Sequence, residues 1–145
     1  MQQKEFLEQL DQARIVEAIG AAESRTSGEI RVHIQPKAGG DIMDVAKKTF
    51  ERLGMTKTSL RNGVLIFIAS EENQFVILGD KGIDDSVPAG FWDEIAAKLT
   101  IRFKAGEFTE GIIDAITAAG EQLRTYYPHE DDDVDELSND IDVSD

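Results

Sequence analysis

The longest uninterrupted run of apolar residues in the chain lies between Arg61 and Ile83. Two apolar runs in this stretch, residues 64–69 and 75–78, are rich in β-branched and aromatic side chains, and the polar residues 70–73 separate them. This pattern is typical of an antiparallel hairpin. The first run is continuously apolar instead of alternating, which indicates a strand that is covered on both faces. We therefore expect this hairpin at the centre of a sheet with helices on both sides.

The residues before the hairpin predict a helix, a strand and a second helix. Apolar residues recur at three- and four-residue spacing over residues 2–25, and residues 29–35 alternate strictly between apolar and polar. Asp41 is a suitable N-cap for a helix that Gly54 would end. A strand, a helix and a strand in this order form a right-handed crossover, so strands 29–35 and 64–69 should be parallel neighbours.

The residues after the hairpin predict a loop over residues 84–88, with room for a short extra strand, and then two amphipathic helices. These helices begin near Phe91 and Phe108. The expected fold class is α/β, a three-layer sandwich whose small mixed β-sheet joins a parallel crossover to an antiparallel hairpin, with helices on both faces. We expect one domain over residues 1–128.

Residues 129–145 differ sharply in composition from the rest of the chain. The full chain carries a formal charge of −14, and the nine carboxylates after Pro128, with no Lys or Arg among them, account for −9 of it, so residues 1–128 carry −5. Such a segment buries little and repels itself, so we expect an acidic disordered tail. Asp131, Asp133 and Asp135 begin like a calcium loop, but Glu136 stands where such a loop needs Gly. Diffuse, weak cation binding is the preferred interpretation of the tail.

Composition narrows the classes of partner and the location. The acidic balance argues against nucleic acid and anionic membranes as partners. The chain has no cysteine, which excludes disulfides, thiolate nucleophiles and cysteine-bound zinc. No apolar run is long enough for a signal peptide or a membrane span. We expect a soluble, cytoplasmic monomer, with a protein as the partner class left open.

The predicted topology gathers polar residues at one end of the sheet, which we call the rim. Both parallel strands start where the hairpin's second strand finishes, so the residues at these positions should lie close together. Carboxylates there are the hard oxygen ligands that Ca²⁺ and Mg²⁺ prefer. The predicted metal ligands are Glu29, Asp80, Asp84 and Asp85. The accompanying residues, for phosphate contact or for structure, are Arg61, Asn62 and Arg31. The alternative is that Arg31 or Arg61 simply pairs with Glu29 or Asp80 in a structural network.

His33 lies on the strand face opposite Ile30 and Ile34. We interpret it as a partly covered histidine on the sheet face, and the alternative is a residue that titrates or binds a ligand.

Several motifs occur in a recognisable order. They are residues 26–32 (TSGEIRV), residues 53–55 (LGM) followed by Thr58, residues 61–66 (RNGVLI), Gly79-Asp80-x-Gly82-Ile83, Trp92 and Phe108-x-x-Gly111-Ile112. Together they resemble the TPM domain, which is named for a thylakoid-lumen phosphatase, a photosystem II repair protein and a modulator of a levamisole-sensitive receptor. The resemblance covers about residues 10–128. It implies a small mixed sheet between helices and divalent-cation binding near acidic loop residues, in a family described both as acid phosphatases and as assembly factors.

Two functions follow from these observations. The chain lacks a cysteine-arginine signature loop, a nucleophilic aspartate motif, a serine elbow and a P-loop, so a phosphatase here would need a metal-activated water. In that case Asp80, Asp84 or Asp85 would hold the ion and Arg61 would contact phosphate. We favour a domain that binds Ca²⁺ or Mg²⁺ at the acidic rim and serves as a non-catalytic interaction or assembly module. The alternative is a metal-dependent, acid-phosphatase-like hydrolase of phosphate esters.

Overall fold

Four strands form a single mixed sheet in the order β3-β2-β1-β4 in the computed structural model, which describes residues 1–129 and 138–145. The strands are β1 (Glu29–Gln35), β2 (Gly63–Ala69), β3 (Gln74–Gly79) and β4 (Asp142–Val143). β1 runs parallel to β2, and β2 runs antiparallel to β3. The parallel crossover and the hairpin predicted from the sequence are both confirmed.

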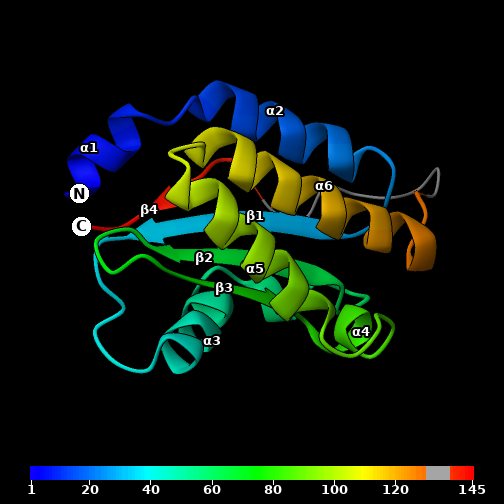
Figure 1. The fold of residues 1–145 in the computed structure, drawn as a ribbon. Coiled ribbons are helices and arrows are strands. Elements are labelled where there is room, and N and C mark those ends of the chain that lie inside the picture. Colours follow the sequence, from blue (N-terminus) through cyan, green and yellow to red (C-terminus); the bar gives the residue numbers. More distant parts are fainter. Residues whose placement is uncertain (130–137) are drawn as a thin grey trace.

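Helices cover both faces of this sheet. They are α1 (Gln3–Glu8), α2 (Gln12–Glu23), α3 (Ile42–Arg52), the 3-10 turn η1 (Met55–Lys57), α4 (Lys81–Asp84), α5 (Phe91–Lys104) and α6 (Phe108–Tyr126). Figure 1 shows α2, α5 and α6 on one face and α3 on the other, where Met55 of η1 joins the same core. This is the predicted three-layer α/β sandwich.

The central strand β2 divides its side chains between two cores. Val64, Ile66 and Ile68 belong to the larger core under α2, α5 and α6, whereas Leu65 and Phe67 belong to a smaller core with α3. Every residue of β2 is buried. The continuous apolar run is therefore explained by period-2 alternation between two covered faces.

The helix expected over residues 2–25 is interrupted, because capping chemistry outweighs the apolar periodicity. α1 ends at Glu8 and α2 begins at Gln12. The Asp11 side chain accepts a hydrogen bond from the backbone N–H of Arg14 (3.2 Å), and the Asp11 N–H donates to Thr109 Oγ1 (3.0 Å). An aspartate N-cap that is also fixed to α6 starts a new helix there.

The loop predicted over residues 84–88 follows a single helical turn, α4, and residues 85–88 contain no strand. The Asp80 carboxylate caps this turn by accepting from the N–H of Lys81 at 2.8 Å.

The expectation of a disordered acidic tail is wrong for the end of the chain. β4 pairs with β1 in parallel, with Asp142 opposite His33 and Val143 opposite Ile34, and Ile141 packs against the larger core. The open edge of β1 supplies backbone hydrogen bonds that the charge argument did not take into account. Residues 130–137, which include Asp131, Asp133 and Asp135 of the incomplete calcium-loop pattern, lie outside the described residues.

Within residues 1–129 and 138–145, no helix is long and apolar enough to cross a membrane.

Candidate functional site

The rim forms as the topology predicts. Glu29 lies opposite Gly63 at the start of the two parallel strands, and Gly79 lies opposite Val64 at the end of β3. The N–H of Asp80 donates to the carbonyl of Gly63 at 2.8 Å. This end of the sheet lies beside α4 in Figure 1.

Arg61 and Asp80 form a bidentate ion pair at the rim. Arg61 Nε lies 2.6 Å from Asp80 Oδ2, and a terminal guanidinium nitrogen lies 2.8 Å from Oδ1. The Asp80 side chain is 6% exposed and that of Arg61 is 47% exposed. The hydrogen bond to Asp80 and its negative charge raise the pKa of Arg61. The sequence left open whether Asp80 binds a metal or pairs with an arginine. The structure contains the Arg61–Asp80 pair.

The backbone around Arg61 depends on Gly82. Arg61 has a φ of +52°, in the left-handed region that non-glycine residues seldom adopt. The N–H of Gly82 donates to the Arg61 carbonyl at 2.8 Å. A Cβ at position 82 would lie 2.5 Å from the Leu60 carbonyl oxygen and 2.7 Å from that of Arg61. Only glycine permits this approach, so this motif residue serves packing.

Trp92 connects two further predicted positions. Its indole Nε1–H donates to Asp84 Oδ1 at 2.9 Å. A Cβ at Gly79 would lie only 2.6 Å from the Trp92 ring. Trp92 is partly buried and packs against the larger core, so it attaches the start of α5 to the sheet.

The remaining predicted residues occupy different environments. Asn62 is buried, and its amide lies 3.4 Å from Ser27 Oγ. Glu29 is buried at the start of β1. Arg31 is partly exposed and lies opposite Leu65, and Asp85 is exposed at the end of α4.

The four predicted metal ligands do not form a closed cage. Arg61 engages both oxygens of Asp80, and Trp92 engages one oxygen of Asp84. Across the part of the chain that the structure describes, no group of three or more His, Asp or Glu side chains is placed to hold a metal ion. A complete all-protein site of the kind that binds Ca²⁺ tightly therefore does not fit these residues. Divalent-cation binding at the rim stays a prediction.

Sequence reasoning missed a second polar cluster, which lies at the other end of the sheet. Asp142 Oδ2 lies 2.6 Å from His33 Nδ1 and 2.8 Å from an Arg52 guanidinium nitrogen. Burial would raise the pKa of Asp142, but hydrogen bonds from Arg52 and His33, together with their charges, outweigh it and lower that pKa. His33 is 1% exposed, so its interpretation as a partly covered residue is corrected to a fully buried one. Alternating Ile141 and Val143 within the acidic tail is the sequence signal that could have indicated a strand there.

A groove of about 410 Å³ lies between α2 and α6. Small residues that include Ala18, Ala22 and Gly120 line it, together with Arg25 and Arg124. The sequence analysis did not anticipate this groove.

Comparison with known proteins gives a family and a similar solved structure. The family model described as "TPM domain" matches residues 1–122. The NMR structure of BA42 protein from the psychrophilic bacterium Bizionia argentinensis superposes with a TM-score of 0.85 at 46% sequence identity, and the match covers 92% of each chain. Among curated proteins, none matches this chain.

Proposed function

The chain belongs to the TPM domain family, and from that premise we propose that it is a non-catalytic interaction domain that binds divalent cations weakly at its acidic rim. The family is described both as acid phosphatases and as assembly factors, so membership alone does not give the function. We therefore choose between these two functions from the geometry of the rim.

The Arg61–Asp80 pair is the observation that carries this proposal. A phosphoryl-transfer site needs a cationic group free to bind the developing charge, and carboxylates free to hold the metal that activates water. Here the guanidinium and the carboxylate satisfy each other through two hydrogen bonds of 2.6 and 2.8 Å. Gly82 allows close approach of the Arg61 backbone, and Gly79 allows the Trp92 ring to pack directly against β3. The motif residues thus form a structural unit.

Weak cation binding is proposed at the two exposed carboxylates of α4. Asp84 retains one oxygen beyond its bond to Trp92, and Asp85 is exposed beside it. Two carboxylates completed by water molecules should bind Ca²⁺ or Mg²⁺ with a Kd of about 10⁻⁴–10⁻³ M, the weak end of the range that ligand charge and site rigidity set.

The alternative, a metal-dependent phosphate-ester hydrolase, makes a different prediction for one experiment. Phosphate release from a chromogenic ester is measured with wild type, Asp85→Asn and Arg61→Lys, each purified over two orthogonal columns, with and without EDTA. We expect no release above a mock purification. Release that is abolished by EDTA and by Asp85→Asn, and that follows the protein through both columns, would establish the hydrolase and overturn the proposal.

A further inference from the structure

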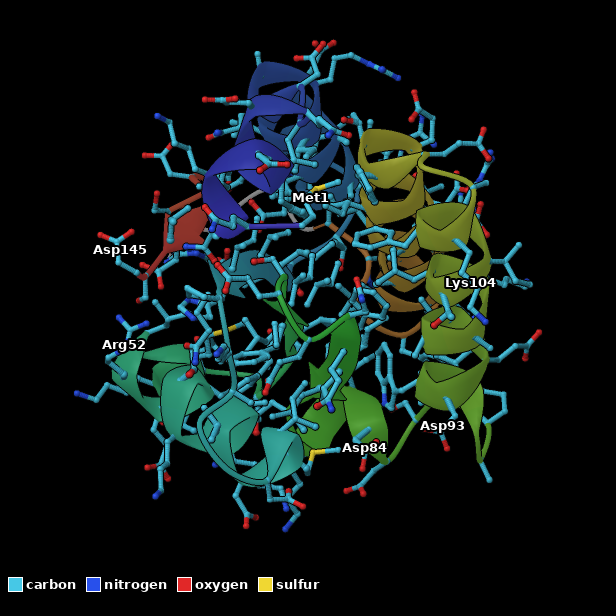
Figure 2. All side chains as sticks on the ribbon, turned by 60° about the vertical axis from the view of Figure 1, so that its left-hand side comes forward. Met1, Arg52, Asp84, Asp93, Lys104 and Asp145 are labelled. Atoms are coloured by element: carbon cyan, nitrogen blue, oxygen red, sulfur yellow. The ribbon has the colours of Figure 1, made fainter. Side chains whose placement is uncertain are left out.

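The last residues of the chain, 141–145, lie on the free edge of β1, and we call them the C-terminal clasp. The backbone N–H of Ser144 donates to the Ile34 carbonyl at 2.9 Å, and the buried side chain of Gln3 donates to the Ser144 carbonyl at 2.7 Å. In Figure 2, Asp145 at the end of the clasp and Arg52 on α3 lie on the same side of the molecule, away from Asp84.

The domain recognises the clasp chiefly through Asp142. Its Oδ2 accepts from His33 on β1 and from the Arg52 guanidinium on α3, so both elements that face it contact the same oxygen. One carboxylate oxygen is thus held from two elements, by charge-assisted bonds of 2.6 and 2.8 Å.

The hydrogen bonds around His33 fix the orientation of its ring and direct Nδ1 toward a carboxylate. Nδ1 faces the Asp142 carboxylate, and Nε2 lies 2.7 Å from Gln35 Oε1. The Gln35 amide nitrogen donates to the Lys37 carbonyl at 2.8 Å, which fixes its oxygen toward His33. Both ring nitrogens of this buried side chain therefore lie within hydrogen-bond distance of an oxygen atom, and the one at Nδ1 belongs to a carboxylate.

The ladder between the clasp and β1 is short. Among the described residues, two of the seven residues of β1 pair with β4, whereas an ordinary strand has about 5–6 residues. A longer extended segment on this edge would keep the carboxylate contact and add backbone pairs. Strand addition to an open edge is a common mode of peptide recognition.

We propose that the edge of β1, with His33, Arg52 and Gln3, is a binding site for an extended segment of another protein in which an aspartate precedes a β-branched residue. The C-terminal clasp is the intramolecular competitor for this site. This inference rests on the proposed role as an interaction domain and names the surface that would serve it.

The test uses the full chain and a fluorescein-labelled peptide with the sequence of residues 138–145, SNDIDVSD. Its binding is measured by anisotropy to wild type, to Asp142→Asn and to the matched control Asp140→Asn, whose side chain is exposed. Wild type should bind weakly, because its own clasp competes at a high effective concentration. Asp142→Asn should bind about tenfold more tightly, and Asp140→Asn should match wild type. A peptide with Asn at the position that corresponds to Asp142 should lose this binding.

A second variant tests the backbone contact independently. Ser144→Pro removes the N–H that bonds to Ile34 and should also raise the affinity for the peptide, with NMR shift changes at His33 and Ile34. Equal binding by all variants, or shift changes confined to other strands, would overturn the proposal. Light scattering that showed tail-exchanged dimers would assign the edge to a second copy of this chain and would also overturn it. None of these outcomes depends on hydrolysis or cation binding, so failure here is distinct from failure of the proposed function.

Discussion

Arg61 and Asp80 join the residues that flank the two ends of the β2–β3 hairpin. Arg61 precedes β2 by two residues and Asp80 follows β3 directly, and two parallel hydrogen bonds connect their side chains. Asp80 at the same time caps α4 through the Lys81 N–H. The pair therefore fixes the open end of the hairpin and the start of the next element.

Replacing Arg61 by Ala should destabilise the domain whether or not a cation is present. The substitution leaves the Asp80 carboxylate, 6% exposed, without its charged partner. We expect the melting temperature to fall by about 3 °C or more. Arg61→Lys, which keeps the charge but not the fork, should fall between Ala and wild type.

Calorimetry in EDTA and in millimolar Ca²⁺ is the measurement. Arg61→Ala that melts within about 1 °C of wild type would contradict the structural role, because such a shift is well below that of a lost buried contact.

Gly82→Ala should be strongly destabilising. Its Cβ would meet two backbone carbonyl oxygens at 2.5 and 2.7 Å and the Tyr127 hydroxyl at 2.7 Å. Backbone atoms cannot move aside as a flexible side chain can, so we expect a loss of about 1–3 kcal/mol in the free energy of unfolding. Gly40→Ala is the matched control, since its nearest neighbour would lie at 3.9 Å. Urea unfolding of both variants checks the prediction, which fails if the two lose the same stability.

The sequence predicted most of the fold because alternation and turn chemistry are local signals. The parallel pairing of β1 with β2 and the turn at residues 70–73 both follow from such signals. The break at Asp11 and the clasp at Asp142 depend on partners about 100 residues away, Thr109 and His33. Spacing along the chain does not report contacts of that kind.

The candidate site was predicted in position but only partly in arrangement. Topology brought Asp80 beside Arg61, whereas the side-chain bonds that engage Asp80 and Asp84 could only be seen in three dimensions. The sequence around a carboxylate does not predict whether an arginine or a cation neutralises its charge.

Titration with Ca²⁺ or Mg²⁺ should move the amide signals of residues 84 and 85 at about millimolar concentration. The comparison uses ¹⁵N-labelled wild type and the double variant Asp84→Asn, Asp85→Asn. Both side chains are exposed, so their replacement removes the carboxylates without disturbing the core. The double variant should lose these shifts and keep its fold. If shifts at residues 84 and 85 are absent while other acidic segments respond, the predicted site is misplaced.

The contribution of Asp142 to the free energy of unfolding should be lost at acidic pH. Its pKa in the folded protein lies below the ordinary value of 3.8, since the hydrogen bonds and charges of Arg52 and His33 outweigh its burial. A carboxyl group with a lowered folded pKa stabilises the fold above its unfolded pKa, and this contribution is lost as the pH falls through the folded value. Asp142→Asn should therefore cost about 1 kcal/mol at pH 7, the scale of a partly exposed charge-assisted bond, and progressively less below about pH 3.8. Asp140→Asn should show no such difference, because its side chain is exposed. Urea unfolding at pH 7 and near pH 3 measures both variants, and a cost for Asp142→Asn that grows toward acid would reverse the sign and refute the assignment of Asp142 as the group that holds the clasp.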